Sequence, residues 1–236
     1  MQIRVGIARF LELIGFIKLV RNWYAALLLR FSPFATRDTE VEIETRGGLR
    51  YVLRPKRGEI SILNEVLYHN IYARQFPVKG VVVDIGAHIG VFTVYAGTVS
   101  DRVICYEPHR DNYELLERNV LLNSLANVVP FQQAVGDSAR VRELSLHATK
   151  SYAHTFYPQD GHNEAETVAV ETITLGDIFS SNQLEHVDFL KMHCECAELG
   201  ILTHEPHAVL SKIDTIAIKH SGCNDTELVA FLQHNN

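Results

Sequence analysis

The sequence predicts an α/β protein in which a doubly wound parallel sheet carries helices on both faces. Two observations support this prediction. From Lys79 onward, short apolar strands alternate with helical stretches, and the first of these strands runs directly into a glycine-rich turn. The length of 236 residues suits one large domain with a small appendage. We therefore expect a helical and hairpin cap over residues 1–76 and the doubly wound domain over residues 77–236.

The N-terminal segment, residues 1–31, is apolar but interrupted by charges at Arg9, Glu12, Lys18 and Arg21. Its charge-free runs are far shorter than the roughly 20 residues that span a bilayer, so we expect neither a transmembrane helix nor a signal peptide. Its net charge is +4, so the remainder of the chain carries −10. Two interpretations stay open: a helix pair packed on its own domain, and a peripheral membrane contact.

The cap continues with a hairpin and a helix. Residues 41–45 and 49–53 alternate apolar and polar side chains around Gly47 and Gly48, which is typical of a β-hairpin. Residues 59–74 follow with helical periodicity. The apolar face of this helix would consist of Ile60, Leu63, Leu67 and Ile71.

The doubly wound domain supplies the alternating elements. Strands are expected at 81–83, 102–106, 128–131, 187–192 and 215–219, and helices at 89–98, 111–124 and 225–233. In the second helix we expect Tyr113, Leu116 and Val120 to face inward and Glu114 to pair with Arg118 outward. A polar stretch over residues 146–164, with His147, His154 and His162, separates the third strand from the fourth.

Charge and cysteine content limit the classes of function. The chain has 22 basic and 28 acidic residues and a net charge of −6, which argues against general attraction to nucleic acid. Its four cysteines do not form the spaced array of a disulfide framework. We therefore expect a protein of a reducing compartment, the cytoplasm.

The first strand carries the clearest motif. It ends in Asp84, and the turn that follows reads Gly86-Ala87-His88-Ile89-Gly90. Ligands of such sheets bind at the carboxyl ends of the strands, where glycine lets them approach the backbone. A dinucleotide fingerprint would need glycine at the positions of His88 and Val91, so the motif does not predict NAD binding.

Glu107 ends the second strand, 23 residues after Asp84. A carboxylate at this point can accept hydrogen bonds from both hydroxyls of a ribose. Asp84 could hold the positively charged amino group of an amino-acid tail, directly or through water. A nucleoside without a pyrophosphate but with such a tail is S-adenosylmethionine, which we therefore expect as the cofactor.

The chain also resembles the FkbM family of S-adenosylmethionine-dependent methyltransferases over about residues 65–231. The segments that carry the resemblance, in order, are Asp84 to Gly90, Glu107-Pro108, Leu115 to Asn119 with Asn123 and Asn127-Val128, Ala134 to Asp137, Thr172 to Leu175, and Val187 to Lys191. The resemblance implies a class I Rossmann-like methyltransferase fold. It also implies methylation of a hydroxyl on a sugar, polyketide or related small molecule, with Asp84, Gly86, Ala87, Gly90 and Glu107 at the cofactor and Asp137 facing the adenine amino group.

Three departures from the family pattern fall near the expected acceptor site. After the fourth strand the family has Asp and Gly where this chain has His193 and Cys196. After the fifth strand, residues 219–221 (Lys-His-Ser) replace a family acid. The antiparallel strand pair that closes the family fold is expected to be missing, because the sequence ends at Asn236, and the fifth strand would then form an open edge.

Methyl transfer to a hydroxyl needs a nearby proton acceptor. We expect either His193 or Glu195 to be this base, with Lys191 orienting the site. His193 could instead only cap the strand. A further interpretation gathers His193, Cys194 and Cys196 with His220 and Cys223 as zinc ligands, although their spacing matches no standard zinc motif.

The predicted function is thus S-adenosylmethionine-dependent O-methylation of a small hydroxyl-bearing molecule. The alternative is a protein that binds the cofactor or a partner but has a degenerate acceptor site and no activity. Both predict binding of adenosylhomocysteine, and only the enzyme would turn over methyl groups.

Overall fold

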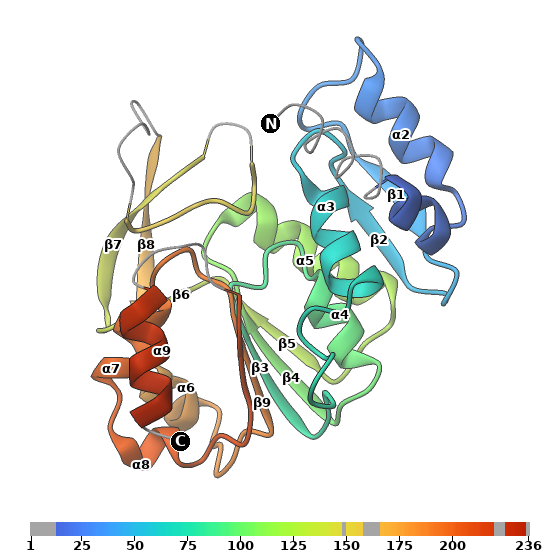
Figure 1. Ribbon diagram of the computed structural model, residues 1–236. Helices are drawn as coiled ribbons and strands as arrows, with labels where there is room; N and C mark the ends of the chain where they lie inside the picture. The colour runs from blue at the N-terminus through green and yellow to red at the C-terminus, as the bar shows by residue number, and fades with distance from the viewer. Residues whose placement is uncertain (1–12, 148–149, 158–165, 220–224, 235–236) are drawn as a thin grey trace.

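A five-stranded parallel sheet forms the centre of the protein (Figure 1). The computed structural model describes residues 13–147, 150–157, 166–219 and 225–234. In spatial order the strands are β10 (Ile216–Ile218), β9 (Phe189–Met192), β3 (Val81–Ile85), β4 (Arg102–Tyr106) and β5 (Val128–Phe131). Every pairing between neighbours is parallel. The predicted parallel sheet and its five strands are confirmed, and β10 is an edge strand of this sheet in the described part of the chain.

Helices cover both faces of this sheet, as predicted. Because side chains alternate along a strand, Val82 packs on one face and Val83 on the other. The first face is covered by α4 (Val91–Gly97) and α5 (Arg110–Leu122). The second face is covered by α6 (Leu175–Ser181), α7 (Glu198–His204), α8 (His207–Leu210) and α9 (Asp225–His234). The fold is therefore doubly wound.

The cap contains the predicted hairpin and a shorter helix than predicted. Residues 13–19 are helical, and α2 (Trp23–Phe31), β1 (Val41–Glu44) and β2 (Arg50–Leu53) follow, with the two strands antiparallel. The next helix, α3 (Glu59–Leu63), passes into a π-helical turn, η1 (Asn64–Tyr68).

The prediction of a helix up to residue 74 is wrong. The amide of His69 donates to the carbonyl of Asn64, which widens the last turn, and Asn70 then adopts a left-handed conformation with φ +50°. Ile71 lies beyond this point and is 39% exposed, so it does not continue the apolar face.

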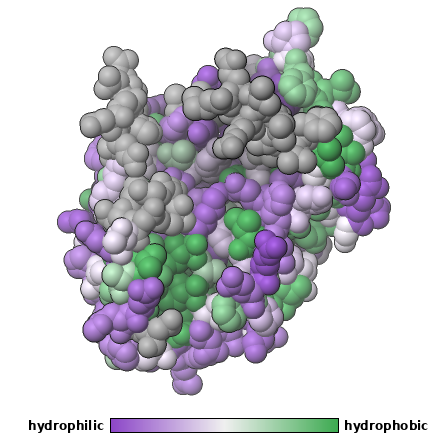
Figure 2. Space-filling view, in the orientation of Figure 1, coloured by the Kyte–Doolittle hydropathy of each residue, from purple (hydrophilic) through white to green (hydrophobic). Residues whose placement is uncertain are grey.

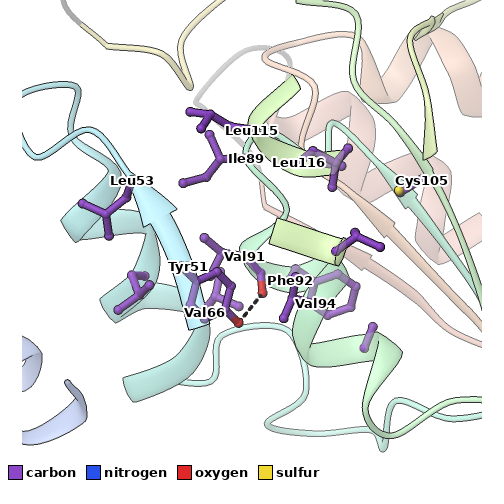
Figure 3. Close-up of a cluster of buried hydrophobic side chains, with 14 of the residues drawn as sticks. Tyr51, Leu53, Val66, Ile89, Val91, Phe92, Val94, Cys105, Leu115 and Leu116 are labelled. Carbon is purple, nitrogen blue, oxygen red and sulfur yellow. Dashed lines mark hydrogen bonds between the residues drawn. The ribbon is translucent and has the colours of Figure 1, made fainter. Parts of the chain in front are cut away.

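The cap and the first helix layer share one hydrophobic cluster (Figure 3). Tyr51 and Leu53 of β2 and Val66 of η1 lie close to Val91 and Phe92 of α4. The hydroxyl of Tyr51 donates to the carbonyl of Val91 at 3.3 Å, so the one polar atom of this buried ring is satisfied. The cap therefore contributes to the core beside α4, while the boundary at residues 76 and 77 stays a prediction.

A second, three-stranded sheet was not predicted. It consists of β6 (Ala134–Val135), β8 (Thr167–Ile173) and β7 (Arg140–Ser145), in that spatial order. β8 runs parallel to β6 and antiparallel to β7. After β7 the chain turns back, because Ser145 bridges to Thr155. The polar stretch over residues 146–164 therefore belongs to the connection between β7 and β8, and its His162 lies outside the described residues.

One predicted ion pair is wrong, although α5 confirms the predicted helix. Glu114 pairs with Arg110 at 2.8 Å, one turn earlier in the same helix. Arg118 instead reaches Glu40 of the cap, also at 2.8 Å.

Among the described residues, none of the helices has both the length and the apolar character that crossing a bilayer requires.

Candidate active site

The conformation of the turn after β3 depends on backbone geometry and backbone hydrogen bonds. Gly86 has φ +75°, and a Cβ atom added there would lie 2.0 Å from the carbonyl oxygen of His193. The amides of Gly86 and Ala87 donate to the carbonyl of Tyr106 at 3.0 and 2.9 Å. The turn is thus held between the ends of β4 and β9, and only glycine fits at its first position.

Glu107, directly after β4, is buried beside this turn. Its Oε2 accepts the amide proton of His88 at 2.8 Å, and its Oε1 accepts that of His109 at 3.0 Å. The side-chain amide of Asn112 lies 3.4 Å from the same Oε1. Burial raises the pKa of Glu107 to about 7 despite these three donors. The carboxyl group is therefore close to half ionised at neutral pH.

His88 links the glycine turn to the segment over residues 150–157. Its backbone is left-handed, with φ +56°, and its Nε2 lies 2.8 Å from the hydroxyl of Ser151. Burial lowers the pKa of His88 well below its usual value, so the ring is neutral. Its Nδ1 is buried and has no hydrogen-bond partner among the described residues. A buried ring nitrogen of this kind is a natural contact for a polar ligand atom.

Asp84 and Lys191 form a buried ion pair that joins β3 to β9. Lys191 Nζ lies 2.8 Å from Asp84 Oδ1 and also donates to the carbonyl of Gly86 at 2.7 Å. The other carboxylate oxygen of Asp84 accepts from Thr93 at 2.6 Å. Asp84 is fully buried, so the structure gives it a role in fixing the turn, and its contact with an amino group of the cofactor, directly or through water, stays a prediction.

Two other residues predicted at the cofactor, Gly90 and Asp137, are not part of the lining of the cavity described below. Gly90, with φ +82°, begins α4, and an added Cβ would lie 2.5 Å from a methyl carbon of Leu116 on α5. Asp137 instead lies 3.3 Å from Arg140 and 3.6 Å from Arg142. Gly90 thus permits close helix packing, and Asp137 is engaged by two guanidinium groups.

The turn after β9 is organised by side chains. The amide of His193 donates to the carbonyl of Ile85, which ties this turn to β3. The His193 ring lies between two partners, with Nε2 3.1 Å from Glu195 Oε1 and Nδ1 3.3 Å from the hydroxyl of Tyr72. The carbonyl of Glu195 accepts from the Thr155 hydroxyl at 2.7 Å. The cap, β3 and the β7–β8 connection thus all contact this turn, at His193 or Glu195.

One cavity brings both turns together at the carboxyl ends of β3, β4 and β9. Of the predicted site residues, the structure gathers six around this cavity: Gly86, Ala87, Glu107, Lys191, His193 and Glu195. Aromatic rings of Tyr72, Tyr152 and Phe156 add apolar walls. Apolar walls with a few convergent polar groups are typical of small-molecule sites.

Several site residues were not predicted from the sequence, because their partners are distant in the chain. The clearest case is a buried network behind the cavity. Arg54 and Glu59 of the cap form an ion pair at 2.6 Å, and Glu59 Oε1 accepts from Ser151, which in turn contacts His88. Tyr72 was also missed. No local motif marks these positions, because Arg54 and Glu59 lie among many other charged residues of the cap.

The cysteines give no support to the zinc interpretation. Burial raises the pKa of the Cys194 thiol well above its usual value, which opposes the thiolate form that binds zinc. Cys196 is disulfide-bonded, a bond that the sequence analysis did not predict. His220 and Cys223 lie outside the described residues. A group of side chains with metal-ligating spacing does occur elsewhere among the described residues, at His186, Asp188 and Asp214.

The parallel sheet, the helices on both its faces and the cavity at its carboxyl edge define a Rossmann-like α/β protein. A sequence model described as the "Methyltransferase FkbM domain" matches residues 84–233, which is more than half of the chain. The chain therefore belongs to the FkbM methyltransferase family, as the motifs predicted.

Individual relatives are more distant. "Methyltransferase 1" of the fungus Beauveria bassiana is 23% identical over 163 residues, which cover 61% of this chain and 66% of the relative. The crystal structure of a methyltransferase FkbM from Methylobacillus flagellatus is 20% identical, with a TM-score of 0.47, over 72% of this chain and 40% of that one. An rRNA methylase from Streptococcus thermophilus is 10% identical, with a TM-score of 0.40, over 71% of this chain and 75% of that one. The chain thus spans just under two thirds of the curated relative.

Proposed function

We propose that this chain transfers a methyl group from S-adenosylmethionine to a hydroxyl of a small molecule. Membership of the FkbM methyltransferase family supports the reaction class. The single observation that carries the proposal is the shared cavity. Gly86 and Glu107, which suit a nucleoside, line the same cavity as His193 and Glu195, which suit proton transfer.

The residues around the β3 turn fit the cofactor. Gly86 lines the cavity, and its glycine lets the turn pack against the His193 carbonyl. Glu107 lines the cavity with a carboxylate that can accept from ribose hydroxyls. The unpartnered Nδ1 of His88 offers a further polar contact in the same wall. Asp84 would act on the cofactor only through Lys191 and the Gly86 carbonyl, which it helps to position.

Bound S-adenosylmethionine would supply a methyl group on a positively charged sulfur. The chain must then orient the acceptor hydroxyl and remove its proton. Burial raises the pKa of Tyr72 far above its usual value, so its hydroxyl stays protonated and can donate to His193 Nδ1. A neutral imidazole has one donor and one acceptor nitrogen. With Nδ1 accepting, Nε2 carries the proton and donates to Glu195 Oε1.

This hydrogen-bond order favours Glu195 over His193 as the base. Both ring nitrogens of His193 are engaged, one by Tyr72 and one by Glu195. A carboxylate has about four lone-pair sites, so the bond from His193 does not exhaust the capacity of Glu195 to take a proton. In this proposal Glu195 accepts the hydroxyl proton, His193 and Tyr72 position the carboxylate, and Lys191 positions the glycine turn.

The experiment combines binding with turnover. Calorimetry should detect binding of adenosylhomocysteine, and radiolabelled S-adenosylmethionine should transfer its methyl group to at least one member of a panel of sugar and polyketide alcohols. Glu195→Gln should abolish transfer and leave adenosylhomocysteine binding within about twofold, because removal of a general base costs about 10²- to 10⁴-fold in rate. Full transfer by Glu195→Gln would contradict the assignment of the base.

The engaged ring of His193 also favours one alternative, a cofactor-binding protein without methyl transfer. In that case the Tyr72–His193–Glu195 chain would close the acceptor end of the cavity. Binding of adenosylhomocysteine without turnover of any acceptor in the panel would favour this alternative. Absence of binding would contradict both.

A further inference from the structure

Helix α2 of the cap presents an apolar face outward. Tyr24, Leu28 and Phe31 recur at the spacing of one helix face and are 57%, 70% and 73% exposed. Phe34, in the turn that follows, is 93% exposed. Figure 2 shows hydrophobic side chains gathered at the upper right, over α2 and this turn. Soluble monomers rarely leave so many large apolar side chains together in water.

The opposite side of α2 is fixed to the protein, so the outward direction of this face is set by the fold. Ala26 is fully buried, and Trp23 and Leu27 pack against the core. At the start of the helix, Asn22 donates to the carbonyl of Glu42 at 3.0 Å. Near its end, Arg30 donates to the carbonyl of Pro55 at 3.0 Å. The helix that carries the apolar side chains is therefore held in place by contacts on its opposite side.

The segment that carries this face is basic, although Arg21 pairs with Glu44 of β1 at 2.8 Å and Asp38 follows the segment. Residues 13–37 contain four basic residues and no Asp or Glu. These are Lys18, Arg21, Arg30 and Arg37, and Lys18, Arg21 and Arg37 are exposed. The chain as a whole carries −6, so the basic character is specific to this segment. Tyr24 adds an aromatic side chain of the kind that is enriched at membrane–water interfaces.

We propose that Tyr24, Leu28, Phe31 and Phe34 form a docking surface for an anionic lipid bilayer. Helix α2 lies in the interface with these side chains in the acyl boundary, and the basic residues beside it contact lipid headgroups. The charge selects this occupant over a second copy of the chain, because two such faces would bring like charges together. The proposal is independent of the methyl-transfer reaction.

Vesicle flotation of the full-length protein provides a direct test. The protein is mixed with vesicles of phosphatidylcholine alone or with vesicles that contain about one third phosphatidylglycerol, an anionic lipid that attracts basic segments. We expect flotation of the protein with the anionic vesicles only. Binding should weaken as salt rises, because screening removes the headgroup attraction.

Two variants that change similarly exposed apolar side chains distinguish binding through this face from nonspecific adsorption to vesicles. The variant Leu28→Gln/Phe31→Gln/Phe34→Ser should lower the vesicle partition coefficient at least about tenfold. Leu121→Gln/Val141→Thr changes two side chains that are 78% and 68% exposed elsewhere on the surface, and it should leave partitioning unchanged. Thermal unfolding confirms that both variants fold.

Three outcomes would overturn the proposal. The first is no flotation of the wild type with anionic vesicles, and the second is equal partitioning of the α2 variant. The third is a wild-type dimer in light scattering that the α2 substitutions dissociate, which would assign the face to a second copy. Methyl-transfer activity in the absence of lipid does not enter any of these outcomes, so the proposal and the proposed function can fail separately.

Discussion

The turns after β3 and β9 lie side by side at the same edge of the sheet, yet they are determined in different ways. The β3 turn is set by backbone, through the left-handed Gly86 and amides that donate to the Tyr106 carbonyl. The β9 turn is set by side chains, through the contacts of His193 with Tyr72 and Glu195. The backbone-determined β3 turn leaves a glycine pattern in the sequence, whereas the β9 turn depends in part on Tyr72, which is 121 residues away in the chain.

This difference predicts how each turn responds to substitution. At the β3 turn, any side chain added at Gly86 should be disruptive regardless of its chemistry. At the β9 turn, the loss of one hydrogen-bonding atom should alter reaction rate more than stability, because the surrounding packing stays intact. The ion pair between Asp84 and Lys191 connects the two turns, so it offers the strongest test of whether they form one unit.

Lys191→Met should have the largest effect on stability. It leaves the carboxylate of Asp84 buried without its ammonium partner, and breaking such a pair costs about 3 to 5 kcal/mol. Urea unfolding should show this loss, with partial recovery in the double variant Lys191→Met/Asp84→Asn. The control Arg118→Met breaks the more exposed pair with Glu40 and should cost less than about 1 kcal/mol. Equal losses in Lys191→Met and Arg118→Met would contradict a buried link between the turns.

Gly86→Ala should have the second largest effect on stability. The added Cβ would collide with the His193 carbonyl and the residue would keep φ +75°, so we expect a loss of about 3 kcal/mol and no detectable binding of adenosylhomocysteine. Gly48→Ala is the matched control, because Gly48 has φ +89° but open space around its Cβ position. It should cost only about 1 kcal/mol. Similar stability and binding in the two variants would show that the β3 turn tolerates a side chain.

Tyr72→Phe should have the smallest effect, and only on the reaction. It removes the hydroxyl that fixes His193, so we expect kcat to fall about tenfold while KM for S-adenosylmethionine stays within about twofold. The pH profile of kcat should also change, which a purely structural role would not cause. Tyr113→Phe, which removes a surface hydrogen bond to Glu117, should leave kcat unchanged. An unchanged kcat in Tyr72→Phe would exclude it as a positioning residue.

The central sheet was predictable because its signals are local. Runs such as residues 81–83 and residues 103–106 belong to strands that are covered on both faces, so they are continuously apolar in the sequence. Their alternation with helices fixes the doubly wound topology. Six of the nine predicted site residues then meet at the cavity, because the carboxyl ends of adjacent parallel strands coincide.

The features that the sequence did not predict fall into two groups. Some depend on tertiary contacts, and others have local sequence patterns. Asp84 looks like a ligand residue in sequence, and only the fold reveals Lys191 as its partner. Tyr72 follows a helix that ends early in a π turn, so its position near His193 has no sequence period. By contrast, the alternating segment over residues 167–173 and the Thr174–Asp177 capping box were visible signals of β8 and α6.

The account depends most on Glu107 as the carboxylate that binds the ribose. Because burial raises its pKa to about 7, the ionised fraction rises about tenfold between about pH 6 and about pH 8. Burial lowers the pKa of His154, which also lines the cavity, to about 3, so its ring stays neutral throughout.

Calorimetric titration of adenosylhomocysteine across this pH range tests the claim directly. A ribose that donates to the ionised carboxylate should bind about tenfold more tightly at about pH 8 than at about pH 6 in the wild type. Glu107→Gln should bind more weakly and show no such rise. A wild-type affinity that is independent of pH, or equal affinity in Glu107→Gln, would contradict the account.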